Sequence, residues 1–314
     1  MRGKILVIRG GALGDFILTL PAIAALRDHF PQAHLEVLGY PHIIQLAQEA
    51  GLVDRAQAIE ARPLAGFFAR NGELAADWVE YFSEFDLIVS YLYDPDSIFE
   101  INVRRCTTAQ FIPGPHRPEK LSSIHATKVY LKPLERLAIF DADPVPRLDL
   151  EPQPSTLNTL ALHPGSGSES KNWPEEKWAE LLQYLAASTD LQLLLVGGEA
   201  EGDRLQRLSR NVFSAIPSAR LRLAQNLPLV ELARLLQNCQ AFIGHDSGIS
   251  HLAAALGLPG LLLWGGSSEE IWRPPSERVI VLRSPGELAE LPMSLVVNNL
   301  HGLVKDVGMR RGFE

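Results

Sequence analysis

The chain has 314 residues, of which 46% are hydrophobic and 21% are charged, a composition typical of a globular protein with room for two domains. Its formal net charge of −8 disfavours wrapping of nucleic acid, which rewards a basic surface, so no nucleic-acid partner is expected. The two cysteines, Cys106 and Cys239, form neither a CxxC pair nor a metal-ligand cluster with histidine, which indicates a reduced cytosolic compartment and predicts no metal site.

The apolar segments are too short to cross a membrane. The longest of them, residues 252–264, is interrupted by Pro259. The apolar run at residues 5–8 is shorter still and is followed at once by glycines, which is not the pattern of a signal peptide. The sequence therefore predicts a cytoplasmic protein, whose contact with the inner membrane would be peripheral.

Short apolar runs alternate with amphipathic helical patterns along the whole chain. The predicted strands are residues 4–8, 35–39, 86–90, 159–163, 191–196, 241–244, 260–264 and 278–282. Their continuous apolar character indicates strands buried on both faces, as in a parallel sheet. Apolar residues at helical spacing follow Pro174 and Pro228, each expected in the first turn of a helix. This alternation predicts α/β domains with right-handed crossovers.

Four prolines fall within residues 141–154, which otherwise show little periodicity. Such a pattern is typical of an interdomain linker. It predicts one Rossmann-like domain over residues 1–150 and a second over residues 151–284, each opening with a strand and a glycine-containing loop. Residues 285–314 are predicted to form a helical segment with a polar tail.

The first glycine loop, residues 9–15, has the sequence Arg-Gly-Gly-Ala-Leu-Gly-Asp and joins a predicted strand to a predicted helix. Such a loop lets a ligand approach the backbone above the positive end of a helix. Asp15 would stand at the sheet edge where ligands bind, although an aspartate here also suits a helix N-cap without any catalytic role. The spacing is not GxGxxG, so dinucleotide binding is not predicted. Pro21 indicates that the helix either starts or kinks there.

Two further polar loops follow predicted strands in the second half of the chain. In residues 163–174, small residues and hydroxyls precede Lys171, which is suited to neutralise a diphosphate. In residues 244–251, the Ser247 hydroxyl, the backbone amides and His251 are suited to phosphate oxygens. Each loop also has a simpler interpretation: a solvated loop with an exposed lysine, and a helix capped by Asp246 with a packed histidine. Two such loops in one domain together favour a ligand site.

These loops resemble the family 9 glycosyltransferases, whose named members are the ADP-heptose:lipopolysaccharide heptosyltransferases. The matching segments are residues 11–15 (Gly-Ala-Leu-Gly-Asp), 163–166 (His-Pro-Gly-Ser) and 246–251 (Asp-Ser-Gly-Ile-Ser-His). The resemblance implies the GT-B fold, with two Rossmann-like domains facing across a central cleft and residues 285–314 packing back on the first domain. It also implies an inverting, metal-independent transfer of a sugar, expected to be heptose from ADP-heptose, to a hydroxyl of a lipopolysaccharide-core-like glycan. The nucleotide sugar is then a substrate, and no cofactor is expected.

The resemblance further implies roles for individual residues. The family's general base corresponds to Asp15 and its diphosphate-contacting lysine to Lys171, which are the predicted catalytic residues. The other residues predicted to bind the donor are Ser166, Gly167, Glu199, Asp246, Ser247, Gly248 and His251, with Glu199 as the ribose-binding carboxylate.

An acceptor site is predicted from local charge. Residues 104–136 contain seven basic and two acidic side chains in an otherwise acidic chain. This excess suits an anionic glycolipid or glycan acceptor, although it also fits an ordinary solvated surface. The residues predicted to bind the acceptor are Gly14, Arg104, Arg105, Arg117 and Lys120.

Three alternatives compete with metal-independent transfer. Asp-x-Asp triplets at residues 94–96 and 141–143 have the spacing that binds a divalent metal in another class of sugar transferases. The first precedes Ser97 and Glu100, which form a predicted capping box, and the second lies in the linker, so neither predicts a metal site. A GT-B-fold sugar-nucleotide epimerase would share the donor site but need no acceptor. A non-catalytic nucleotide-sugar-binding protein would share the fold without turnover.

Overall fold

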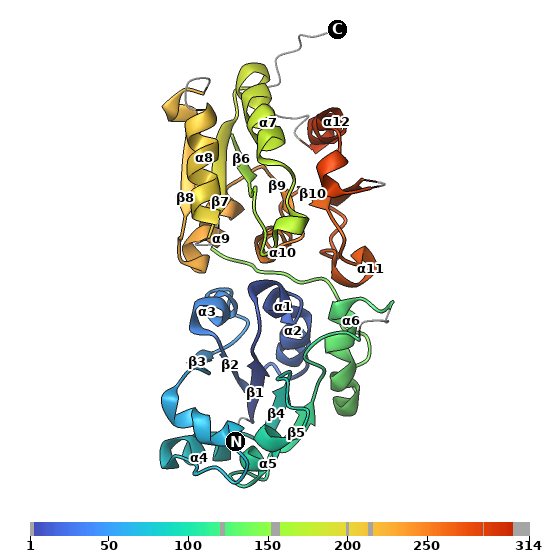
Figure 1. Cartoon of the computed structure of the whole chain (residues 1–314). Coiled ribbons are helices and arrows are strands. Elements are labelled where there is room, and N and C mark those ends of the chain that lie inside the picture. The colour runs from blue at the N-terminus through green and yellow to red at the C-terminus, as the bar shows by residue number, and fades with distance from the viewer. Residues whose placement is uncertain are drawn as a thin grey trace. The chain divides into compact units, whose positions relative to one another are not determined.

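The chain divides into two compact units, Met1–Asp149 and Leu150–Glu314. The computed structural model describes residues 3–119, 123–151, 158–198, 201–212, 216–284 and 286–303. Each unit contains one parallel β-sheet flanked by helices (Figure 1). The predicted α/β architecture with two Rossmann-like sheets is therefore confirmed.

The first unit is built around a five-stranded sheet of order β3-β2-β1-β4-β5. Its elements are β1 (Lys4–Arg9), α1 (Leu13–Ile17), α2 (Leu20–His29), β2 (His34–Gly39), α3 (Pro41–Glu49), β3 (Arg55–Ala58), η1 (Arg62–Phe68), α4 (Ala76–Ser83), β4 (Leu87–Ser90), α5 (Ile98–Arg104), β5 (Gln110–Pro113), α6 (Ala126–Leu131) and η2 (Lys132–Leu137), where η marks a 3-10 helix. The chain runs outward from β1 to β3 and then returns to the other side of β1 with β4. The carboxyl ends of β1 and β4 are therefore the topological switch point, where ligands bind in open α/β sheets.

The second unit repeats this plan in a six-stranded sheet of order β11-β10-β9-β6-β7-β8. Its elements are β6 (Thr159–Leu162), η3 (Glu169–Lys171), α7 (Glu175–Ser188), β7 (Gln192–Gly197), α8 (Gly202–Val212), η5 (Ser218–Arg220), β8 (Leu221–Gln225), α9 (Leu229–Gln237), β9 (Ala241–His245), α10 (Gly248–Ala255), β10 (Gly260–Trp264), α11 (Glu269–Trp272), β11 (Val279–Arg283), η6 (Leu288–Glu290) and α12 (Met293–Leu303). Here the chain reverses between β8 and β9, so the switch point lies at the carboxyl ends of β6 and β9.

The core of the second unit combines its central strands with the apolar faces of α7 and α12. Helix α7 buries the four residues whose spacing predicted it, Trp178, Leu181, Leu182 and Leu185. Helix α12 adds Val296, Val297 and Leu300 to the same core. The C-terminal segment is thus anchored on the second unit up to residue 303, and its packing on the first domain stays a prediction.

The strands and helices differ from the prediction in a few places. All the predicted strands are present, but β3, β5 and β8 were not predicted. Two of these, β3 and β5, form the edges of the first sheet and β8 forms an edge of the second, where a strand needs no continuous apolar run. Pro174 and Pro228 occupy the N-cap positions of α7 and α9 rather than their first turns. Pro21 lies in the first turn of α2, so the helix starts there and does not kink.

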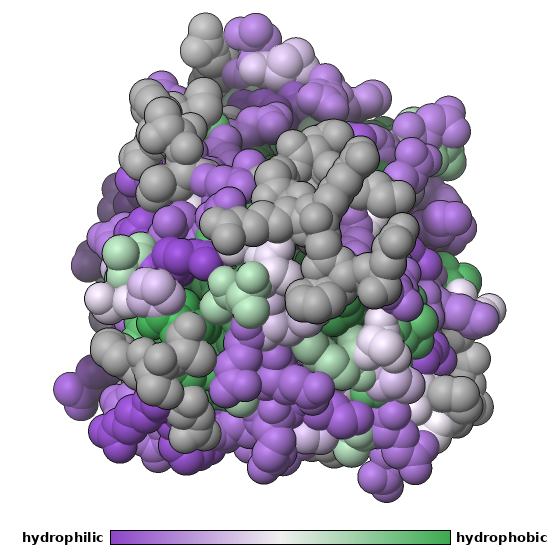
Figure 2. All heavy atoms as spheres, turned by 90° about the horizontal axis from the view of Figure 1, so that it is seen from above, coloured by the Kyte–Doolittle hydropathy of each residue, from purple (hydrophilic) through white to green (hydrophobic). Residues whose placement is uncertain are grey.

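On the face shown in Figure 2, hydrophilic side chains predominate and the apolar ones form small patches between them. Within the described parts of the chain, no helix is long and apolar enough to cross a membrane.

Candidate active site

Asp15 lies in α1, directly after the glycine turn that ends β1, at the switch point of the first sheet. Its Oδ2 accepts a hydrogen bond from the backbone N–H of Ala12 at 3.3 Å, and Ala12 is the N-cap residue of the helix. Asp15 is therefore the third residue of α1 (position N3), whose side chain bonds back to the N-cap backbone, and is not itself the N-cap. The Asp15 side chain is 12% exposed, which leaves the carboxylate within reach of a ligand.

Arg9, the last residue of β1, was not singled out by sequence analysis, yet it lies beside Asp15. Its Nη2 is 3.7 Å from Asp15 Oδ1 and donates a hydrogen bond to the Asp15 backbone carbonyl at 3.3 Å. Its guanidinium also packs over the Tyr130 ring, 4.7 Å from the centroid. The carboxylate that is predicted to act as a base is thus paired with a buried cation.

The predicted acceptor residues Gly14 and Arg117 share the carboxyl edge of this sheet with Asp15. Gly14 is the second residue of α1, and Arg117 is an exposed residue of the loop after β5. Next to Arg117, the His116 ring packs on Tyr93, whose centroid lies 4.5 Å away and whose side chain is largely exposed. Burial, together with the cations of Arg117 and Arg9, lowers the pKa of His116, so this imidazole is neutral at neutral pH.

The structure does not bring Arg104 and Arg105 to this edge. Both lie at the C-terminal end of α5, where Arg104 pairs with Glu100 at 2.8 Å and Arg105 donates to the Gly72 carbonyl at 3.1 Å. In a parallel sheet, a crossover helix ends beside the amino end of the next strand, so the end of α5 that carries these arginines lies at the edge opposite α1, which carries Asp15 (Figure 1). We therefore do not retain them as acceptor residues. The predicted residues Lys120 and Glu199 lie outside the described residues.

Lys171 lies at the switch point of the second sheet. It is the last residue of η3, which follows β6. Its Nζ donates a hydrogen bond at 2.6 Å to Oδ2 of Asp246, the residue directly after β9. The Ser267 hydroxyl, from the loop after β10, donates to the same oxygen at 2.5 Å. Lys171 is therefore a positioned cation rather than a free lysine of a solvated loop. Sequence analysis did not single out Ser267.

Two buried histidines brace the loops that carry these residues. His245 Nε2 accepts a hydrogen bond from the Trp173 backbone N–H at 2.9 Å, so its Nδ1 carries the proton and donates to the Gly165 carbonyl at 3.2 Å. His163 Nδ1 lies 3.2 Å from the Ser247 hydroxyl. Burial lowers the pKa of His245 to about 3 and that of His163 to about 4, so both rings are neutral at neutral pH.

The loop after β6 is shaped by Ser166. Its hydroxyl lies 2.8 Å from both the Ser168 carbonyl and Asn172 Oδ1. Ser166 therefore organises the loop from inside. Gly167 beside it is exposed, and a Cβ there would meet no atom within 4 Å, which leaves open space above the loop.

Ser247 rather than Asp246 caps α10. The Ser247 hydroxyl accepts a hydrogen bond from the Ser250 backbone N–H at 3.3 Å, and Gly248 begins the helix. The first amide groups of α10 have no partner within the helix and lie at the same edge as Lys171, an arrangement suited to an anion. His251 is buried within α10.

The Asp-x-Asp triplets serve local structure. Asp94 accepts hydrogen bonds from the backbone N–H groups of Phe99 and Glu100, at 3.1 and 3.0 Å, and so caps α5. Ser97 occupies the N-cap position, as predicted, but its side chain makes no capping bond. Asp143 pairs with Arg147 in the linker. Across the described parts of the chain, no group of three or more His, Cys, Asp or Glu could hold a metal ion.

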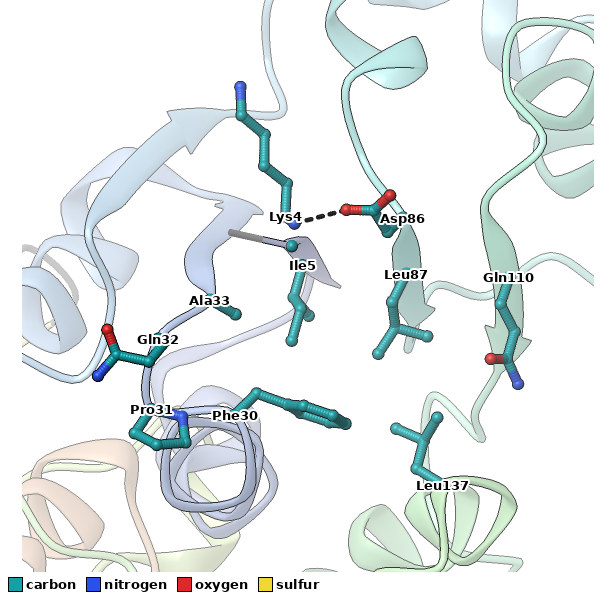
Figure 3. Close-up of a pocket in the computed structure, with 11 residues that line it drawn as sticks. Lys4, Ile5, Phe30, Pro31, Gln32, Ala33, Asp86, Leu87, Gln110 and Leu137 are labelled. Atoms are coloured by element: carbon teal, nitrogen blue, oxygen red, sulfur yellow. Dashed lines mark hydrogen bonds between the residues drawn. The ribbon is translucent and has the colours of Figure 1, made fainter. Parts of the chain in front are cut away.

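A pocket of about 890 Å³ opens at the amino edge of the first sheet (Figure 3). Apolar side chains form much of its wall: Ile5 of β1, Leu87 of β4, Leu137 of η2, and Phe30, which directly follows α2 (Figure 3). It lies at the edge opposite the switch point and contains none of the predicted site residues. We therefore place the candidate site at the carboxyl edges and not in this pocket.

Two Rossmann-like sheets, each with charged residues at its switch point, are the architecture of GT-B glycosyltransferases. Residues 141–296 match the sequence profile of glycosyltransferase family 9 (heptosyltransferase), and the chain belongs to this family. The predicted family and fold are confirmed.

Known relatives agree with this assignment. The chain is 31% identical to lipopolysaccharide heptosyltransferase 1 of Escherichia coli K12 over 133 residues, 39% of this chain and 40% of that relative, so the match spans less than half of the relative's length. It is 24% identical to lipopolysaccharide heptosyltransferase 3 of E. coli, over 89% of this chain and 88% of that relative. The structure of E. coli heptosyltransferase WaaC with ADP superimposes with a TM-score of 0.74 at 18% identity, covering 96% of this chain and 99% of that one.

Proposed function

We propose that this chain is an inverting heptosyltransferase, which transfers heptose from ADP-heptose to an acceptor hydroxyl of a lipopolysaccharide-core-like glycan without a metal ion. The observation that carries the proposal is an ion pair at each switch point, in which a charged residue lies beside a less exposed partner of opposite charge: Asp15 with Arg9 in the first unit and Lys171 with Asp246 in the second. The family assignment supports the sugar transfer, and the ADP of the WaaC structure supports the choice of nucleotide. These relatives do not favour the epimerase or the non-catalytic alternative.

In the proposed reaction, the acceptor hydroxyl oxygen forms a bond to the anomeric carbon of the donor. The bond from that carbon to the terminal phosphate oxygen of ADP breaks, and ADP leaves with the electron pair. Asp15 accepts the hydroxyl proton as the bond forms. Lys171 and the amides at the start of α10 neutralise the leaving diphosphate, which is the part that a metal ion plays in other transferases. Attack opposite the leaving group inverts the anomeric configuration.

The proposed acceptor is anionic. Arg117 offers an exposed cation at the same sheet edge as Asp15, suited to a phosphate or carboxylate group of the acceptor. The backbone amide of Gly14 is proposed as a further contact. A lipid-anchored acceptor would bring the chain to the cytoplasmic face of the inner membrane as a peripheral protein.

The test is an assay of the full chain with ADP-heptose and a soluble, deacylated core glycan. The proposal expects ADP release only with the acceptor, no loss of rate in EDTA, and NMR spectra of the product that show inversion at the anomeric carbon. Conversion of the donor sugar without acceptor would indicate an epimerase instead. Binding of ADP without turnover on any acceptor would indicate a non-catalytic protein. A thermal shift with UDP or GDP but not ADP would keep the fold and refute the donor.

A further inference from the structure

Arg9 is buried in a way that the proposed function alone does not explain. Its side chain is only 2% exposed, and the four residues before it in β1, Ile5–Ile8, are apolar. Its Nε is buried and has no hydrogen-bond partner among the described residues. Burial of a guanidinium is unfavourable unless it is well paired, and an apolar residue of similar size at such a place is often neutral or stabilising.

The contacts of Arg9 join three separate segments of the chain at the switch point. Nη1 donates to the Tyr91 carbonyl at 3.2 Å, just after β4, and to the His116 carbonyl at 2.9 Å, in the loop after β5. Nη2 donates to the Asp15 carbonyl at 3.3 Å, in α1 after β1. The planar guanidinium can make these bonds together because its donors form a rigid fork.

The Asp15 carboxylate is the charge partner of this clamp. Among the described residues, it is the only carboxylate within 4 Å of the Arg9 guanidinium. Its two oxygens have different neighbours: Oδ2 faces the Ala12 N–H, and Oδ1 lies 3.7 Å from Arg9 Nη2. The carboxylate is therefore oriented from two sides, and the separation at Oδ1 is too long for a hydrogen bond from Arg9 to this oxygen.

We infer that Arg9 is a positioning residue for Asp15, which orients the carboxylate and ties it to the loop that carries His116 and Arg117. The Asp15 carboxylate and the loop proposed to bind the sugar acceptor then form one rigid group. The kinetic consequence of this inference rests on the proposed function. A rigid group matters because misplacing a reacting group by about 1 Å can cost about 10²-fold in rate.

A double-mutant cycle on kcat tests the inference. Arg9→Met should lower kcat by about 10²-fold in the wild-type background. In the Asp15→Asn background, Arg9→Met should cause no further loss, because the group that it positions is already inactive. An equal loss in both backgrounds, or no loss in the wild-type background, would overturn the inference. Should Arg9→Met fail to fold, Arg9→Lys takes its place in the cycle, since lysine keeps the charge but not the fork.

Arg27→Met is the matched control. Arg27 is also a clamp: it donates to the Leu52 and Ala33 carbonyls at 3.2 and 3.0 Å and pairs with Asp54 at 2.6 Å. It lies at the C-terminal end of α2, away from the switch point. Its replacement should lower the melting temperature and leave kcat unchanged. A kcat loss in Arg27→Met as large as in Arg9→Met would mean that loss of any such clamp disables the chain, and would overturn the positioning role.

Crystal structures of the wild-type chain and of Arg9→Met separate this inference from the proposed function. The Asp15 carboxylate should adopt one orientation in the wild type and a shifted or multiple orientation in the variant. An unchanged Asp15 would overturn the inference whatever the kinetics. If the wild-type chain transfers no sugar, the proposed function fails, while the two structures still decide whether Arg9 positions Asp15.

Discussion

Replacing Lys171 by methionine removes the ammonium and keeps most of the side-chain volume. Its Nζ lies 2.6 Å from Asp246 Oδ2 and its side chain is 36% exposed, a surface setting in which the effective dielectric constant is about 20. In such a setting the electrostatic attraction between the ammonium and a unit negative charge of the diphosphate about 4 Å away is roughly 4 kcal/mol, and the paired Asp246 offsets part of that attraction. We therefore expect Lys171→Met to lower kcat by about 10²- to 10³-fold, as for loss of one donor to a developing charge, and to weaken ADP binding.

Initial rates of ADP release and calorimetric titration with ADP measure the two effects. Lys177→Met is the matched control, because Lys177 lies on α7 of the same unit and donates to the Ala289 and Leu291 carbonyls at 2.7 and 2.8 Å. This control should leave kcat and ADP affinity unchanged. A normal kcat and a normal ADP affinity in Lys171→Met would refute the assignment of Lys171 to the diphosphate. Equal losses in both variants would point to the fold of the unit instead.

Three further predictions concern the first loop and the buried histidines. Asp15→Asn should lower kcat by about 10²- to 10⁴-fold with the ADP Kd unchanged, and a weakened ADP Kd would contradict its role as a base. Gly11→Ala should lower kcat and cost about 1–3 kcal/mol of stability, because Gly11 has φ +103° and a Cβ would lie 3.2 Å from Asp15 Oδ2. Gly51→Ala is the control: Gly51 has φ +68° with open space around its Cβ, so this change should lower the melting temperature and leave kcat unchanged. His163 and His245 have lowered pKa values, against an ordinary 6.5, so the unfolded chain binds more protons below about pH 6.5. The free energy of unfolding should therefore fall from pH 7 to pH 5 by roughly 1–2 kcal/mol per histidine, and a melting temperature that does not fall over this range would contradict this account.

Much of the fold could be predicted because its central strands are buried on both faces. Uninterrupted apolar segments form Leu160–Leu162 in β6 and Gly260–Trp264 in β10. Such a segment is typical of a strand that is buried on both faces of a parallel sheet. The edge strands give no such signal. Strand β3 (Arg55–Ala58) has the sequence Arg-Ala-Gln-Ala and pairs with β2 at the edge of the sheet, a contact that the local sequence does not encode.

The candidate site could be predicted only where its residues follow a strand within one loop. Asp15 and Lys171 both stand in polar, glycine-containing loops that local spacing reveals. Arg9 stands in the first of these loops, but its partners Tyr91 and His116 are 82 and 107 residues away in sequence. A basic residue at the end of an apolar strand predicts no particular contact. Its role becomes visible only when the folded sheet brings the ends of β1, β4 and β5 together.

The two switch points share one arrangement with the charges reversed. In the first unit the more exposed member of the pair is an anion, Asp15 at 12%, and the buried one is a cation, Arg9 at 2%. In the second unit the more exposed member is a cation, Lys171 at 36%, and the less exposed one is an anion, Asp246 at 9%. In each pair the less exposed member helps to hold the charge of the more exposed one in place. The signs are those that the proposed reaction needs: the more exposed charge is an anion in the first unit, to accept the hydroxyl proton, and a cation in the second, to neutralise the departing diphosphate.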